Sequence, residues 1–325
     1  CQELFSRILE GKSGTHIPLS FVAKDGEQIF VEGNISPRFL EGNVVAAHCI
    51  FRDITESKKA DEALKENAKK LLRYSKHLEQ IIASLNVAKE VQQSLLPRRQ
   101  PKVKRFDIAG RSLYCDETGG DYYDYIKLPH MGSDVYGIIV GDVSGHGVSA
   151  ALQMASVRAY LHGRVAQVGT VAEIITDVNR LVSADAMETA VFMTLFFLKI
   201  EACTGRLSWV RAGHDPALIY SPDLDHFEKL EGKGLPLGVD KSYQYRAHTA
   251  VVKPGQLLIL TTDGIWESRN IKGEIFGRER LKELIRRNAD LEAEGIKLAI
   301  IDAVRNFRGE AKQDDDITLV ILKFL

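Results

Sequence analysis

Four aspartates, each bordered by glycines or by a short apolar run, constrain this chain more than any other feature of its sequence. They are Asp121 in GGDYYD, Asp142 in GDVSGHG, Asp263 in TTDGIWE and Asp315 in DDDITLV. The apolar runs YGIIV, QLLIL and ITLVIL beside the last three are typical of buried strands. A carboxylate at the end of a core strand is costly to desolvate unless it meets a cation or hydrogen-bond donors. No Lys or Arg stands beside these aspartates, so the pattern favours hard divalent ions, which take oxygen ligands.

Composition excludes some partner classes. With 325 residues, the chain has room for two domains and a sizeable core. Its net charge of −1 points neither to nucleic acid nor to an acidic membrane surface. No apolar stretch approaches the roughly 20 residues of a membrane span, and no signal peptide is visible. A local basic run in LPRRQPKVKR is either a solvated linker or a patch that docks a partner; its cations are Arg98, Arg99, Lys102, Lys104 and Arg105.

The cysteines point to a reducing compartment. Cys1, Cys49, Cys115 and Cys203 are scattered, with no CxxC pair and no metal-like spacing. We therefore expect ordinary thiols and a cytoplasmic protein. The start at Cys1 rather than Met suggests a piece excised from a longer protein.

Residues 1–55 carry strand signals around the turn dipeptide Asp25-Gly26. The segments KDGEQIFVEGNISP and GNVVAAHCIFRDIT resemble the C-terminal half of a PAS sensor domain, whose last strand typically ends in a signature like Asp53-Ile54-Thr55. The earlier half, where much of a PAS ligand pocket is normally built, is missing. The signal or ligand therefore cannot be identified.

Residues 56–97 are predicted to form a linker helix. Leucines recur every seven residues, with a second set four positions later; the two sets are Leu64, Leu71, Leu78 and Leu85, and Ala68, Ser75 and Ile82. A strict heptad repeat indicates a left-handed coiled coil, here a parallel homodimer through 60–85. The alternative is an amphipathic helix that lies on the domain that follows it in its own chain. The next apolar positions, Ala88, Val91 and Leu95, change phase, which predicts that the last turns leave the dimer seam and pack on the domain that begins near residue 98.

Residues 98–325 are predicted to form one domain with alternating strand and helix signals. Strands are expected near 106–113, 122–128, 135–142, 190–200, 206–212, 216–220, 226–231, 244–252, 256–262 and 316–324. Helices are expected at 147–164, 170–187, 277–288 and 291–307. Thr170 followed by Glu173 is a capping box that starts the second helix. Two consecutive helices followed by a run of strands do not fit strict βαβ alternation, so the prediction is an α+β fold, an α-β-β-α sandwich.

Six motifs in order carry a family resemblance. GGDYYD, GDVSGHGVSAAL, AGHDPALIY, GLPLGV, TTDGIWES and DDDITLVIL resemble the PPM-type metal-dependent protein serine/threonine phosphatases, in particular the bacterial RsbU/SpoIIE-like branch. The resemblance implies two Mn²⁺ or Mg²⁺ ions, with Asp142 bridging them and the Val143 carbonyl on one. Asp263 and Asp315 would hold the second ion, and Asp121 would act through metal-bound waters. The triplet 314–316 leaves Asp315 or Asp316 open as the ligand, and comparison with the family pattern favours Asp315.

The resemblance also implies a function. Two divalent ions clamp phosphate oxygens and activate a water for in-line attack on phosphorus, so no protein nucleophile is required. The expected substrate is phosphoserine or phosphothreonine on a STAS-type anti-sigma-factor antagonist, with the PAS and coiled-coil segments regulating the enzyme. The alternatives are a catalytically weak scaffold with the same fold and a two-metal hydrolase of small phosphoesters.

Other polar residues within these motifs are expected to have structural rather than catalytic roles. His146 is a candidate general acid, but the resembling branch tolerates Lys at that place, so a catalytic role is not expected. His214 is expected to organise a hairpin rather than to bind metal. Tyr122, Tyr123 and Tyr125 are expected on strand faces. The arginine that grips phosphate in eukaryotic relatives has no evident counterpart.

Overall fold

The structure, a computed structural model, describes residues 2–189 and 191–325. The chain divides into two compact units, Cys1–Ile82 and Ala83–Leu325. Cys1 and residue 190, where one strand was expected to begin, lie outside the described residues, while Cys49, Cys115 and Cys203 are free thiols. No helix in the described part of the chain is long and apolar enough to cross a membrane.

The first unit contains a helix and a three-stranded antiparallel sheet. After α1 (Gln2–Leu9), the strands β1 (Gly14–Val22), β2 (Gln28–Leu40) and β3 (Asn43–Asp53) pair in sequence order. The turn between β1 and β2 contains Gly26 at φ 92°, a backbone conformation that favours glycine. Thr55 ties the start of the following helix to β2, because its hydroxyl oxygen accepts a hydrogen bond from Phe30 N at 2.9 Å. The expected strands are therefore present, and the relationship to PAS domains stays a prediction.

The predicted linker helix is confirmed as a helix, α2 (Thr55–Leu95). Leu64, Leu71 and Leu78 are exposed along it in the single chain. Towards its end the expected packing is partly wrong, because Val91 is 58% exposed whereas Gln92 is only 5% exposed. Gln92 lies seven residues after Leu85, so the face that carries the leucines continues to the residue that is buried.

The second unit is an antiparallel sandwich of two five-stranded sheets. The orders are β10-β9-β12-β13-β4 and β11-β8-β7-β6-β5. The strand bounds are β4 (Phe106–Leu113), β5 (Tyr122–Lys127), β6 (Val135–Val143), β7 (Met193–Glu201), β8 (Arg206–Ala212), β9 (Ala217–Ser221), β10 (His226–Leu230), β11 (His248–Val251), β12 (Leu257–Thr261) and β13 (Ile317–Phe324). Two short 3₁₀ turns, Pro129–Met131 and Pro222–Leu224, interrupt the connections.

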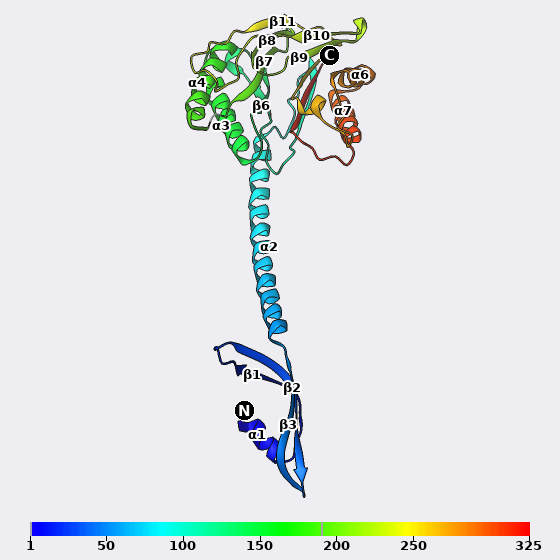
Figure 1. Cartoon of the computed structure of the whole chain (residues 1–325). Coiled ribbons are helices and arrows are strands. Elements are labelled where there is room, and N and C mark those ends of the chain that lie inside the picture. The colour runs from blue at the N-terminus through cyan, green and yellow to red at the C-terminus, as the bar shows by residue number, and fades with distance from the viewer. Residues whose placement is uncertain (1, 190) are drawn as a thin grey trace. The chain divides into compact units, whose positions relative to one another are not determined.

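Helices cover both outer faces of the sandwich (Figure 1). Apolar side chains of α3 (Val148–Val165) and α4 (Val171–Thr189) share a core with the β5–β8 sheet. Those of α5 (Gly264–Glu267), α6 (Arg278–Arg287) and α7 (Ala293–Arg308) share another core with the β12–β13 sheet. A third core fills the space between the sheets. The α-β-β-α prediction is thus confirmed.

Local predictions in this unit agree closely with the structure. The Thr170–Glu173 capping box forms, with Thr170 N donating to Glu173 Oε2 at 2.7 Å and Glu173 N donating to Thr170 Oγ1 at 3.3 Å. The strand expected over 244–252 is shorter, because Tyr245 instead turns inward and its hydroxyl donates to Leu235 O at 2.7 Å. The short helix α5 was not anticipated.

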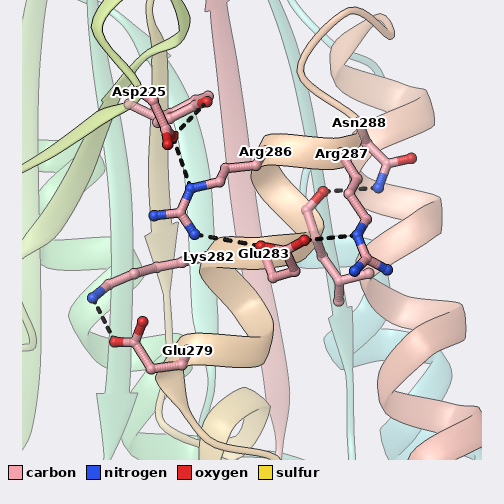
Figure 2. Close-up of polar contacts among 9 residues, drawn as sticks. Asp225, Glu279, Lys282, Glu283, Arg286, Arg287 and Asn288 are labelled. Carbon is pink, nitrogen blue, oxygen red and sulfur yellow. Dashed lines mark hydrogen bonds and ion pairs between the residues drawn. The ribbon is translucent and has the colours of Figure 1, made fainter.

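Ion pairs fix α6 to the β9–β10 hairpin (Figure 2). Arg286 Nε donates to Asp225 Oδ1 at 2.8 Å, and Arg286 also pairs with Glu283 on its own helix. Lys282 pairs with Glu279, and Arg287 pairs with Glu283. Such exposed pairs each contribute little to stability, so the buried apolar face of α6 holds the helix and the ion pairs orient it.

Candidate metal centre

Strand register brings the four aspartates to one end of the sandwich. Asp121 directly precedes β5 and Asp142 lies near the end of β6, and the pairing Tyr122↔Gly141 makes these two neighbours. In the other sheet, Asp263 follows β12 and Asp315 precedes β13. The pairing Thr261↔Leu319 places those two ends side by side as well.

Asp316 connects the two sheets at this end. Its side chain is buried, and Oδ1 accepts a hydrogen bond from Cys115 N at 2.8 Å. Oδ2 accepts from Gly120 N at 2.8 Å and from Asp121 N at 3.3 Å. Asp316 is therefore committed to holding the loop that leads into β5, whereas the Asp315 side chain is exposed.

A second contact between the sheets orients Asp121, which is only 1% exposed. The Thr262 hydroxyl donates to Asp121 Oδ2 at 2.8 Å and accepts a hydrogen bond from Thr318 N at 3.0 Å. Both threonines lie at the β12–β13 end, whereas Asp121 directly precedes β5. The pair therefore fixes the Asp121 carboxylate at the junction of the two sheets.

The carboxylates destabilise one another's charge. Burial, followed by the charges of Asp263 and Asp315, raises the pKa of Asp142 to about 8. Burial and then the charge of Asp142 raise the pKa of Asp121 well above its usual range. Burial followed by Asp315 raises the pKa of Asp263. Asp315 is solvent-exposed by surface area, yet the protein atoms packed around it raise its pKa too.

No lysine or arginine pairs with these carboxylates within the described residues. Divalent cations are the ions that such an oxygen-only donor set fits. Among the same described residues, no three His, Cys, Asp or Glu side chains already lie together as a ligand group. The repulsion among these carboxylates is the term that a bound divalent cation would offset.

Glycines permit close backbone approach around the centre. A Cβ on Gly264 would collide with Asp316 O, and one on Gly119 would collide with Asp316 Oδ2. A Cβ on Gly120 would lie 3.0 Å from the Val143 carbonyl oxygen, the predicted backbone ligand. Neither Gly119 nor Gly264 has a positive φ, so it is space rather than backbone conformation that requires glycine there.

The two histidines of the motifs lie in different surroundings. The side chain of His146 is 70% exposed, and its Nδ1 lies 2.7 Å from Asp116 Oδ2. His214 is buried with both ring nitrogens occupied, Nδ1 by Thr194 Oγ1 at 2.8 Å and Nε2 by Thr261 O at 3.2 Å. His214 therefore joins β7 to the end of β12, as expected for a residue that organises structure.

Sequence reasoning missed Gln92, which reaches the same loop as Asp316. Gln92 Nε2 donates to Gly119 O at 2.6 Å, and Gly119 N donates to Gln92 Oε1 at 3.1 Å. Gly119 is two residues before Asp121. The one signal in the sequence was the position of Gln92 seven residues after Leu85 on the helix. That position alone does not predict a contact with Gly119.

Comparisons with known proteins place the chain in a family. A family model described as Stage II sporulation protein E (SpoIIE) matches residues 132–325, more than half of the chain. The phosphoserine phosphatase RsbU of Bacillus subtilis (strain 168) is 28% identical over 246 residues, which cover 75% of this chain and 71% of RsbU. Asp142, Asp263 and Asp315 fall inside the family match, whereas Asp121 precedes it.

Solved structures share the fold. The PP2C domain of SiaA from Pseudomonas aeruginosa has a TM-score of 0.65 and 25% identity, covering 76% of this chain and 98% of that domain. RsbX, whose crystal structure is of a complex with magnesium, has a TM-score of 0.53 and 16% identity, covering 70% of this chain and 99% of RsbX. The PPM family is metal-dependent, in keeping with an acidic centre whose carboxylates have no Lys or Arg ion-pair partner among the described residues. The chain belongs to the SpoIIE family of PPM-type protein serine/threonine phosphatases.

Proposed function

We propose that this chain removes phosphate from a serine or threonine of a STAS-type anti-sigma-factor antagonist, as a bacterial signalling enzyme. The observation that carries the proposal is the convergence of Asp121, Asp142, Asp263 and Asp315 at one end of the sandwich, each at or beside the end of a different strand. The similarity to a relative named a phosphoserine phosphatase supports the same reaction class.

Two Mn²⁺ or Mg²⁺ ions would be held by these four carboxylates and by the Val143 carbonyl. When bound, such ions supply an activated water and neutralise charge on the phosphate oxygens. The chain's own residues set the geometry: Thr262 orients Asp121, and Asp316 fixes the loop that carries it. Supporting contacts of this kind determine where metal ligands point.

Regulation through the N-terminal part is the second element of the proposal. We assign 1–55 to a partial PAS-like sensor, 56–97 to a coiled-coil linker and 98–325 to the phosphatase domain. The exposed leucines along α2 support a parallel homodimer through 60–85. The contact between Gln92 and Gly119 supports transmission from this helix to the metal centre.

The test compares substrates in the presence of Mn²⁺. A phosphorylated STAS protein encoded near this chain's own gene and p-nitrophenyl phosphate are assayed side by side. Because the metal centre provides chemistry but little recognition, we expect kcat/KM to be about a hundredfold or more higher for the phosphoprotein. Equal efficiencies would favour a small-phosphoester hydrolase, and no turnover of either substrate would favour a scaffold.

A further inference from the structure

A basic cavity lies at the edge of the sandwich, away from the four aspartates. It has a volume of about 1120 Å³ and lies between segment 97–105 and strands β4, β5 and β13. Strands β4 and β5 are the edge strands of their sheets. All of its lining residues belong to the second unit. We refer to this site as the basic cavity.

Cations from both sides line the basic cavity. They are Arg98, Arg99, Lys102 and Lys104 from the segment, Arg111 from β4 and Lys323 from β13. Among the described side chains that line the cavity, two are carboxylates, those of Asp107 and Glu292. Asp107 is already engaged, because its Oδ2 accepts a hydrogen bond from Ala293 N at 2.7 Å. The cavity therefore carries a clear excess of positive charge.

Most of these cations have no protein partner. Lys323 Nζ donates to Ala289 O and Leu291 O at 2.8 and 2.9 Å. Within the described residues, the four cations of the segment form neither hydrogen bonds nor ion pairs through their side chains. Like charges held around one concavity repel one another, so an anion that enters it gains favourable interactions with several of them at once.

Two further features accompany this positive charge. The Tyr125 hydroxyl, on a residue that lines the cavity, is buried and has no hydrogen-bond partner among the residues that the structure describes. Buried polar atoms are normally paired. In addition, Arg111 also borders a neighbouring cavity of about 260 Å³, where Lys89, Arg305 and Arg308 add positive charge.

We propose that the basic cavity binds a compact anion with two or more phosphate groups. Guanidinium and ammonium groups that converge on one concavity suit clustered phosphate oxygens, which arginine can bind in bidentate fashion. The apolar part of the wall, formed by Phe106, Ile108 and Tyr125, fits the organic body of a nucleotide. The cavity is also of the size of small-ligand sites. A protein partner would instead meet a broader, flatter surface.

Occupancy would have a consequence for the linker. Segment 97–105 directly follows α2, whose Gln92 holds Gly119. An anion that joins the segment to Arg111 on β4 would fix this end of the helix against the sandwich. Binding should therefore stabilise the second unit, independently of whether the chain's substrate is the one proposed above.

The test measures binding without catalysis. Sodium tripolyphosphate, and separately ATP, are titrated by calorimetry into the full chain at low salt with EDTA, which removes divalent ions from the acidic centre. We expect saturable, salt-sensitive binding and a raised Tm. The triple variant Arg98→Gln/Arg99→Gln/Lys102→Gln should weaken binding by about tenfold or more, because three charge-assisted contacts are lost. The control Lys127→Gln/Lys229→Gln/Lys241→Gln removes the same charge at exposed sites outside the cavity and should leave the affinity unchanged.

The two probes distinguish a polyphosphate from a nucleotide as the ligand. The variants distinguish failure of this proposal from failure of the proposed function. Equal affinities for both probes indicate the shared phosphate chemistry, whereas tighter ATP binding indicates a nucleotide. The proposal is overturned if neither probe binds, if sulfate binds as tightly as tripolyphosphate, or if the control variant weakens binding as much as the cavity variant. A cavity variant that retains tripolyphosphate binding but raises KM for the phosphoprotein would instead identify a protein-docking surface. Because Asp142→Asn leaves the cavity intact, we expect it to bind the probes normally even where turnover is lost.

Discussion

Gln92 and Gly119 hold each other through both polar groups, with hydrogen bonds of 2.6 and 3.1 Å in opposite directions. The pair is buried, and it joins the last turns of α2 to the loop that enters β5. On the other side of the same loop, Asp316 accepts hydrogen bonds from Gly120 and Asp121. The position of Asp121 is thus set between a linker helix and a strand from the far end of the chain.

Gln92→Ala tests this arrangement. The substitution leaves the buried Gly119 N–H and C=O without partners, so we expect the free energy of unfolding to fall by about 1–3 kcal/mol. The looser loop should also raise the Mn²⁺ concentration needed for half-maximal activity. Gln93→Ala, at the exposed neighbouring position, is the matched control. Unchanged Mn²⁺ dependence in Gln92→Ala would show that the contact does not position the centre.

Asp142→Asn should abolish turnover while leaving the fold intact. The neutral amide removes a charge that its neighbours repel, so the metal-free variant should be at least as stable as the wild type. Loss of several kcal/mol of transition-state stabilisation corresponds to a rate loss of about a thousandfold or more. Phosphoprotein turnover and thermal unfolding are measured on both proteins, with the exposed Asp223→Asn as control. Retained Mn²⁺-dependent activity would refute the metal assignment.

Asp315→Asn and Asp316→Asn should separate activity from stability. Asp316 accepts three backbone hydrogen bonds, and an amide can accept at only one of its two terminal atoms, so Asp316→Asn should lower stability by about 1–3 kcal/mol. Asp315→Asn should lose activity and metal affinity but keep the wild-type Tm in EDTA. The reverse pattern would make Asp316 the ligand.

Buried His214 predicts a pH dependence of stability. Burial lowers its pKa to about 4, below the ordinary value of 6.5. Between these two values the unfolded chain binds the proton and the folded chain does not. The free energy of unfolding should therefore fall as pH drops through this window, by about 3 kcal/mol at most from this residue.

Urea unfolding of wild type and His214→Gln in EDTA isolates that contribution. We expect the stability difference between the two proteins to shrink from pH 7.5 to pH 4.5. The exposed His130→Gln should keep the wild-type dependence. A pH-independent difference for His214→Gln would show that the imidazole titrates alike in both states.

Leu71→Glu with Leu78→Glu tests the linker. Charges in an apolar seam disfavour a coiled coil, so we expect monomers by light scattering, altered phosphatase activity and unchanged Mn²⁺ binding. His77→Glu with Gln80→Glu adds the same charge outside the seam and should leave the oligomeric state unchanged. A monomeric wild type, or full activity in the leucine double variant, would reject a dimeric switch.

Local patterns in the sequence were sufficient to predict the layered fold and to single out the four aspartates as candidate metal ligands. Apolar runs predict strands, and 3.6-residue periodicity and caps predict helices, because each depends on neighbours within a few residues. Thr170 and Glu173 illustrate this, since both partners of the capping box lie within one helical turn. Four carboxylates placed beside core strands likewise indicate a metal centre wherever those strands meet.

Only the tertiary structure decided which polar residues support that centre. Asp316 lies 196 residues from Gly120, and Gln92 lies 27 residues from Gly119, so no local pattern pairs them. Apolar periodicity favoured Val91 for packing, but a buried loop with free backbone groups is better matched by an amide than by a methyl group. The same holds for the basic run at 98–105. Its composition is that of a solvated linker, and only folding places its cations around one cavity with Arg111 and Lys323, because side chains distant in sequence are brought together by strand order and not by spacing.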